Sequence, residues 1–307
     1  MNPSRLLART RKHAIKALTP AVQAVTYELL FRHGQDKLFS KLVRAREIFS
    51  GKLIRLEASS VCQLRCPACS ISRWRKRGGA TKDGEGGVIG WGLLRYQDFA
   101  RLLKENPAIR TVELSNWGEI FLNPELIPIM RLAHERGVKL RAVNGVNFNR
   151  VSEETLRALV DYRFGPITVS IDGATHESYK RYRRVMRHIR YLERYKDSQG
   201  ARDPKLTWQF IVFGHNEHEI ELARELAAEL KMNFRAKLNH TPGYSPVQDP
   251  AQVRALIGGP ASREEFFQQK RRAYSRPCTQ LWTSPQINWD GKLLGCWATL
   301  ATSSRQG

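Results

Sequence analysis

Long apolar runs and export signals are both missing from this chain of 307 residues. No stretch is long enough to cross a bilayer as a helix, and the N-terminal stretch MNPSRLLARTRKHAIKAL lacks the apolar core of a secretory signal. We therefore expect a cytoplasmic protein. No acid precedes Glu28, so a transit peptide or a helix on a membrane surface stays open, although a solvated basic helix is the preferred interpretation.

Acidic residues are scarce relative to basic ones. The chain has 29 Asp and Glu against 51 Lys and Arg, a net charge of +22, and the basic residues cluster at the N-terminus, at 73–77 and at 180–194. Such an excess favours anionic partners: nucleic acid, a phospholipid surface or a phosphorylated substrate. No helix-turn-helix, zinc-finger or aromatic-studded RNA-binding motif accompanies the charge, so nucleic acid is not the favoured partner.

Cysteine is also rare, and its distribution is uneven. Three of the five cysteines, Cys62, Cys66 and Cys69, fall within eight consecutive residues. Without an export signal, so few cysteines argue against a disulfide framework, and no second close pair exists to complete a structural zinc site. Three thiolates on one loop suit a [4Fe–4S] cluster that keeps one iron open, with buried or chance cysteines as the alternative.

Short apolar runs alternate with amphipathic segments from about residue 53 onward, after a basic N-terminal region that we predict to be helical. Strands are predicted at 53–59, 111–117, 139–145, 167–173, 206–213 and 234–239. Helices are predicted at 124–137, at 152–162 and at 218–230. A further long helix is predicted after the strand at 167–173 and ends at about residue 195. Alternation repeated this often predicts a parallel sheet with helical crossovers, either a barrel or an open sheet.

Polar residues fall at the carboxyl ends of these predicted strands, where parallel sheets place their functional sites. They are the cysteine loop, Gly118 and Glu119, Asn144, Asp172 and Asn216. Each has an ordinary explanation by itself: a helix N-terminal acid for Glu119, and turn formation for Asp172 and the two asparagines. Their shared position at strand ends is the stronger argument for a site.

The cysteine spacing C-x3-C-x2-C just after a first strand resembles the signature of the radical S-adenosylmethionine (SAM) enzymes. The resemblance implies a partial (β/α)6 TIM-like barrel and a [4Fe–4S] cluster whose open iron is chelated by SAM. It also implies reductive cleavage of SAM and a 5′-deoxyadenosyl radical that abstracts hydrogen from a substrate. It covers roughly residues 53–240, with a weaker match in the tail.

Further motifs agree with this resemblance. Trp117-Gly118-Glu119 resembles the family's Gly-Gly-Glu motif, in which Glu119 would accept from the SAM amino group. The stretch VSIDGATHESYKRYR resembles the fourth-strand pattern, which implies Ser170 and Asp172 near the ribose and Arg183 near the carboxylate. Asn144 and Asn216 match cofactor-side positions at the third and fifth strands. Departures are Trp117 for glycine, Val143 for threonine, and Ala68 where an aromatic residue often packs on adenine.

The tail contains Cys278, Gly291 and Cys296 in the spacing that opens the SPASM/twitch extension of one branch of the family. That extension normally supplies more cysteines, whereas 11 residues without cysteine follow Cys296 here. Two interpretations of Cys278 and Cys296 are therefore open: ligands of an auxiliary iron–sulfur cluster, or a pair of inert thiols. The surrounding QINWDGKLLGC predicts a short β-hairpin.

The predicted organisation has four parts: a basic helical extension (1–52), the radical SAM core (53–240), a linker and helix (241–277), and a partial SPASM/twitch-like β-hairpin extension (278–307). Expected partners are a small-molecule or peptide substrate, in which anionic groups would suit the charge, and a reductant such as flavodoxin or ferredoxin. Peripheral membrane contact stays open. The alternatives are a degenerate iron–sulfur protein without turnover and a radical enzyme that modifies nucleic acid.

Overall fold

The computed structural model describes residues 52–67, 69, 72, 89–241, 243–271, 274 and 284–294. Several features of the sequence lie outside these residues. They are the basic N-terminal extension, Ala68, the basic run at 73–77, and the tail cysteines Cys278 and Cys296. The predictions made for them remain predictions.

A single sheet with the strand order β6-β5-β4-β3-β2-β1-β7-β8 organises the described residues. Every neighbouring pair from β6 through β1 to β7 is parallel, and β7 and β8 form an antiparallel pair. The strands are β1 (Leu53–Leu56), β2 (Thr111–Glu113), β3 (Lys139–Val146), β4 (Ile167–Ser170), β5 (Leu206–Val212), β6 (Asn233–Leu238), β7 (Gln286–Ile287) and β8 (Leu293–Leu294). The predicted six-strand parallel α/β core is confirmed.

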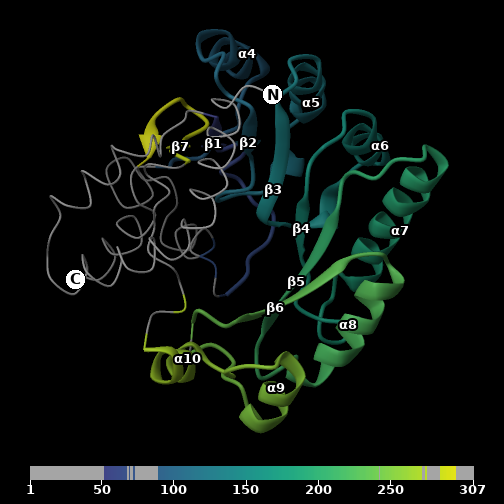
Figure 1. Ribbon diagram of the computed structural model, residues 1–307, viewed down its shortest axis with the longest axis vertical. Coiled ribbons are helices and arrows are strands. Elements are labelled where there is room, and N and C mark those ends of the chain that lie inside the picture. The colour runs from purple at the N-terminus through teal and green to yellow at the C-terminus, as the bar shows by residue number, and fades with distance from the viewer. Residues whose placement is uncertain are drawn as a thin grey trace, which may run out of the picture. The chain divides into compact units, whose positions relative to one another are not determined.

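Helices connect the parallel strands and lie along one side of the sheet (Figure 1). The α-helices are α4 (Tyr96–Glu105), α5 (Leu126–Glu135), α6 (Glu153–Asp161), α7 (Tyr182–Ser198), α8 (Ile220–Glu229), α9 (Pro250–Ile257) and α10 (Arg263–Lys270). Three short 3-10 helices, η1 (Ile120–Leu122), η2 (Phe148–Arg150) and η3 (Glu217–Glu219), follow the ends of β2, β3 and β5. This strand–helix alternation is the partial TIM-like barrel that the resemblance implied.

The two faces of the sheet differ in chemistry. On the helix-facing side, paired residues in register are apolar and buried, as at Val169 opposite Trp208, which is 0 % exposed. On the opposite face the paired residues are polar, as at Glu113 opposite Arg141 and Gln209 opposite Arg235. Side chains alternate between the two faces along a strand, so one face builds the core while the other presents polar groups.

Local signals in the sequence fix the ends of several helices. The Ser152 side chain accepts a hydrogen bond from the Thr155 N–H at the start of α6, and Glu153 and Glu154 lie in the first turn. Gly137 follows α5 with φ of +65°, a left-handed conformation that glycine adopts without strain. Ser152 thus begins α6, and Gly137 ends α5 where the chain turns back into β3.

The segment after β6 holds a helix that was not predicted. The stretch HTPGYSPVQDPAQ reads as a linker, yet α9 begins within it at Pro250. The start signals are present, because the Asp249 side chain accepts from the Gln252 N–H and proline occupies the first turn. The predicted charged helix (α10) and the predicted hairpin (β7 and β8) are both observed.

Among the residues that the structure describes, no helix is long and apolar enough to cross a membrane.

Replacing Ser152 with alanine should lower the free energy of unfolding by about 1 kcal/mol, because the first turn of α6 loses its side-chain acceptor. Ser152→Asp should retain most of the stability, since a carboxylate can accept from the same N–H. Urea unfolding followed by circular dichroism measures both changes. Equal losses in the two variants would contradict the capping role.

Candidate functional site

The sequence-predicted site residues follow the carboxyl ends of parallel strands, as expected. The cysteine loop comes after β1, Gly118 and Glu119 after β2, Asp172 after β4 and Asn216 after β5. Parallel strands end at the same edge of a sheet, so these segments share one rim. Hydrogen bonds join the connections after β1, β2 and β3 to one another, and others join the ends of β4 and β5.

The cysteine loop carries three cysteines that form no disulfide. Cys66 is exposed, Cys62 and Cys69 are half-buried, and the Cys69 N–H donates to the Cys66 carbonyl over 3.1 Å. Desolvation by neighbouring protein, then the charges of Cys69, Asp172 and Cys62, raise the pKa of the Cys66 thiol to about 12. The influence of Asp172 puts the end of β4 close to the cysteine loop.

Glu57, just past the end of β1, binds the backbone of the connection that follows β2. Its buried carboxylate accepts from the N–H of Trp117 over 3.1 Å and from that of Gly118 over 3.2 Å. Burial raises the pKa of Glu57 to about 8 against the lowering effect of these two N–H donors, with a smaller raising contribution from Glu113. The carboxylate therefore holds the Trp117-Gly118-Glu119 motif in position.

Gly118 lies against the backbone that leads into the cysteine loop. A Cβ at this position would sit 2.1 Å from the Ser59 carbonyl oxygen and 2.7 Å from that of Val61. The Glu119 N–H donates to the same Val61 carbonyl over 2.8 Å. Only glycine permits this approach, so the motif after β2 and the cysteine loop form one packed unit.

Glu119 joins three segments of the rim. Its Oε2 accepts from the N–H and side-chain amide of Asn147, at 2.6 and 2.5 Å, and its Oε1 accepts from the Phe121 N–H. The Asn147 Oδ1 in turn accepts from the Gln63 side chain in the cysteine loop over 2.7 Å. Burial raises the pKa of Glu119 to about 8. Three hydrogen bonds leave one acceptor position on Oε1.

Glu113, at the end of β2, likewise accepts a backbone N–H, here from the neighbouring strand β3. It accepts from the Val143 N–H over 3.1 Å and from the Ser115 hydroxyl over 2.7 Å. Its Oε2 lies 3.2 Å from the Arg141 Nε, an ion pair that is buried on the glutamate side. Burial raises the pKa of Glu113 against these hydrogen bonds and the arginine charge.

Asp172 and Asn216 join the ends of β4 and β5. The Asp172 Oδ1 accepts from the Ile211 N–H over 2.9 Å, and the Asn216 side-chain amide donates to the Asp172 and Ile211 carbonyls. Asn216 is 0 % exposed, so its amide is committed to the fold. Desolvation raises the pKa of Asp172 to about 6, opposed by the Ile211 N–H and then by the positive charge of Lys237.

A polar ladder crosses β4, β5 and β6 on the polar face of the sheet. The Arg235 guanidinium donates to the Gln209 Oε1 over 2.8 Å, and the Gln209 amide lies 3.5 Å from the Ser170 Oγ. One step farther along the strands, Lys237 pairs in register with Ile211, the residue whose N–H binds Asp172. Ser170 and Asp172 thus face two cations contributed by β6.

The remaining predicted residues lie farther out. Asn144 is exposed, and its N–H donates to the Ser115 Oγ over 3.1 Å. Arg183 is exposed on the first turn of α7, among other cations. Hydrogen bonds thus link the cysteine loop, Gly118 and Glu119, and a second set links Asp172 to Asn216. Asn144 is bonded to Ser115, the partner of Glu113, whereas Arg183 lies apart on α7.

Sequence reasoning missed Glu57, Glu113, Arg235 and Lys237. The available signal was the alternation of polar and apolar residues in LIRLE and FRAKL, which marks strands with one polar face. That pattern cannot show that the polar face meets a cluster of cysteines, because the meeting depends on strand order.

Within the described residues, no group of three or more histidine, cysteine, aspartate or glutamate side chains is arranged to hold a metal ion. The donor chemistry of the loop is nevertheless specific. Three cysteines outside any disulfide lie on one loop, and thiolates are the usual protein ligands of iron–sulfur clusters.

The fold is similar to that of SuiB from Streptococcus suis. The crystal structure of SuiB bound to S-adenosylmethionine matches 96% of this chain and 74% of SuiB, with 15% identity and a TM-score of 0.55. The structure of SuiB bound to precursor peptide SuiA matches 100% of this chain and 67% of SuiB, with 15% identity and a TM-score of 0.55. No protein-family model matches the sequence, and no curated protein shows significant similarity. The likeness establishes the fold.

Gly118→Ala should lower the free energy of unfolding by about 1–3 kcal/mol, because the new methyl group would collide with backbone that cannot easily move. Gly259→Ala is a matched control, since a Cβ there has no neighbour within 4 Å. The control should stay within about 1 kcal/mol of the wild type. Urea unfolding of both variants checks the difference, and similar stabilities would refute the close approach at Gly118.

Glu57→Gln should change how stability depends on pH. The folded pKa of about 8 lies above the ordinary value of 4.5, so the stability associated with protonated Glu57 is complete below pH 4.5 and is lost as pH rises through 8. Glutamine does not titrate, so the variant should gain stability relative to the wild type between pH 5 and 8. Unfolding midpoints at pH 5, 6.5 and 8 test this, and parallel pH profiles would contradict it.

Proposed function

We propose that this chain is a radical SAM enzyme in which Cys62, Cys66 and Cys69 hold a [4Fe–4S] cluster. One observation carries the proposal: three cysteines in C-x3-C-x2-C spacing, none in a disulfide, follow the first strand of a fold similar to that of a SAM-bound protein. Three protein ligands leave one iron for SAM. When bound, the cluster and SAM supply reductive cleavage of a carbon–sulfur bond and hydrogen abstraction from a substrate.

The chain's own residues would position SAM beside the cysteine loop. Gly118 keeps the backbone after β2 close to that loop, and the remaining acceptor position on the Glu119 Oε1 suits the SAM ammonium. Asp172, fixed by the Ile211 N–H, would face the ribose. Asn216 acts by holding the Asp172 backbone, which makes it a positioning residue.

The polar face of the sheet would receive the substrate. Arg235 and Lys237 lie on β6, one strand beyond the Ile211 N–H that binds Asp172, and Lys237 is half-buried. Desolvation and the charges of Arg235 and Arg263 lower the pKa of Lys237, and Asp172 opposes them. A substrate with an anionic group would relieve the repulsion among these cations.

The substrate itself is a small molecule or a peptide. SuiB, a protein of similar fold, binds a precursor peptide, which supports a peptide for this chain. The reductant would be a small electron carrier such as flavodoxin or ferredoxin. An auxiliary cluster at Cys278 and Cys296 remains a prediction for residues outside the described part.

Two variants separate the cluster from the cofactor. Cys66→Ala should abolish iron–sulfur absorbance and 5′-deoxyadenosine release together, because the cluster loses a ligand. Asp172→Asn should retain the absorbance, since the amide oxygen can still accept from the Ile211 N–H, while SAM affinity falls by about 10-fold or more. Anaerobic reconstitution, iron analysis and a nucleoside assay measure these effects.

Either of two results would count against the proposal. A reconstituted wild-type cluster that releases no 5′-deoxyadenosine with SAM and reductant would favour a degenerate binding protein. Loss of the cluster in Asp172→Asn would show that this residue serves the metal site and not the ribose.

A further inference from the structure

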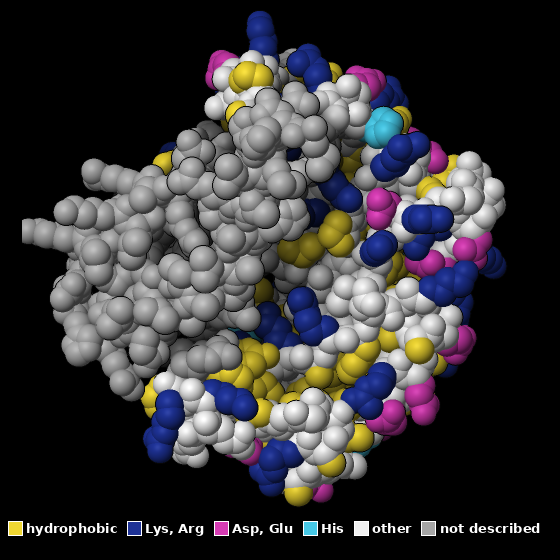
Figure 2. Space-filling view, viewed as in Figure 1, with side chains coloured by type: hydrophobic (Ala, Val, Ile, Leu, Met, Phe, Trp, Pro, Cys, Tyr) yellow, Lys and Arg dark blue, Asp and Glu magenta, His cyan; other side chains and the backbone are white. Residues whose placement is uncertain are grey.

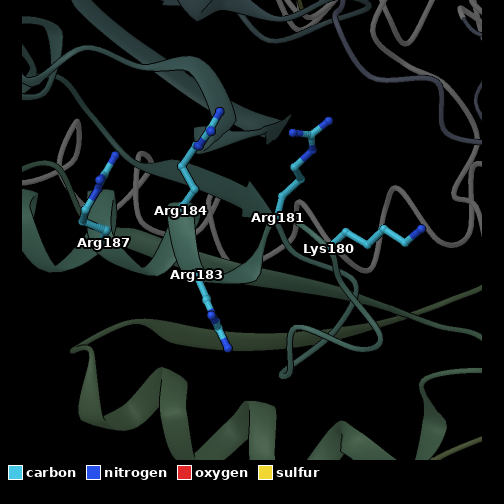
Figure 3. Close-up of a pocket in the computed structure, with 5 residues that line it drawn as sticks. All are labelled: Lys180, Arg181, Arg183, Arg184 and Arg187. Carbon is cyan, nitrogen blue, oxygen red and sulfur yellow. The ribbon is translucent and has the colours of Figure 1, made fainter.

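A cavity of about 430 Å³ lies at the start of α7, and the described residues that line it are all cations: Lys180, Arg181, Arg183, Arg184 and Arg187. Figure 3 shows the five side chains around the first turns of the helix. The Arg181, Arg184 and Arg187 side chains extend to one side, whereas Arg183 extends to the opposite side. We call this cavity the basic pocket.

No acidic side chain balances the basic pocket within the described part of the chain. Other exposed cations do form ion pairs there, as Lys231 does with Asp197 at 2.8 Å and Arg224 does with Glu221. None of the five pocket cations has such a pair, and no acid occupies the first turn of α7. Figure 2 shows Lys and Arg side chains over much of the described surface, but the pocket gathers five around one cavity.

This arrangement is electrostatically unfavourable in the free protein. Arg184 and Arg187 are three residues apart on α7 and extend to the same side (Figure 3), so their like charges repel. The amino end of a helix also carries partial positive charge, so cations in its first turn are disfavoured. A bound anion would reverse both effects.

The pocket nevertheless rests on a rigid base. The preceding loop is tied to Glu219, which accepts from the Ala174 N–H over 2.7 Å, the Ser178 hydroxyl over 2.5 Å and the Thr175 hydroxyl over 2.6 Å. The opposite side of α7 packs into the core through Val185 and Ile189, both 0 % exposed. The cations are therefore presented by a fixed backbone and do not need a folding step to assemble.

We propose that the basic pocket binds the phosphate or diphosphate group of a small molecule. Four of its five cations are arginines, whose planar fork matches phosphate oxygens with paired hydrogen bonds. A diphosphate places several negative charges within one compact group, whereas an acidic peptide spreads its carboxylates along an extended chain. The cavity volume also lies in the range of small-molecule sites.

The pocket follows the Asp172 connection directly. Lys180 is eight residues beyond Asp172, and Tyr179, just before it, is close enough to Asp172 and Cys66 for both charges to affect its pKa. Assigning the phosphorylated ligand as the substrate rests on the proposed function, with Arg183 kept for the SAM carboxylate as the sequence resemblance implies. The other four cations would then anchor the substrate at the rim of the site.

Titration of the full chain, without cluster or SAM, with inorganic pyrophosphate tests the pocket by calorimetry at fixed ionic strength. We expect saturable binding that Arg184→Gln/Arg187→Gln weakens by about tenfold or more. Arg190→Gln/Arg194→Gln is the matched control, because these substitutions remove the same charge from the same helix. Both residues are exposed and lie outside the pocket. The control should change affinity by less than about twofold, and circular dichroism confirms folding of both variants.

Three results would overturn the inference: no saturable binding of pyrophosphate, equal weakening in both double variants, or capture of a short RNA or an acidic peptide that pyrophosphate cannot displace. The test is separate from that of the proposed function. Pyrophosphate binding without 5′-deoxyadenosine release would support the pocket and contradict the proposed enzyme activity. Release of 5′-deoxyadenosine without pyrophosphate binding would support the enzyme activity and contradict the pocket.

Discussion

Buried carboxylates that accept backbone N–H groups across strand ends are the interactions on which the rim depends. Glu57 reaches from β1 to the connection after β2, Glu113 reaches from β2 to β3, and Asp172 reaches from β4 to β5. Glu119 ties the connection after β2 to that after β3. Without these contacts the polar connections would have to satisfy their donors with water, and the rim would lose its fixed shape.

This arrangement has an electrostatic consequence. Each carboxylate is desolvated, so its pKa rises despite the donors around it, and the rim holds acids that are reluctant to ionise. Such a surrounding favours a cationic partner at the rim, because positive charge would stabilise the ionised acids. The sulfonium and ammonium groups of SAM have this charge, which agrees with the proposed function.

The cations are distributed in a complementary way. Arg235 and Lys237 on β6 face the rim from the polar side of the sheet, and the basic pocket stands beyond the β4 connection on α7. Cationic groups therefore lie both on β6 and at the start of α7. Under the proposed function, both would attract the anionic part of a substrate.

The sequence by itself determined the alternation of elements, the parallel sheet and the loop that carries Cys62, Cys66 and Cys69, because periodicity, capping residues and spacing are local properties. Even the unpredicted α9 had its signals at Asp249 and Pro250, hidden within a turn-rich stretch. The tertiary structure alone decided that Glu57 meets Gly118 and that Asp172 comes near Cys66. Those contacts join residues about 60 to 110 positions apart, and only strand order and burial determine which distant polar groups must satisfy one another.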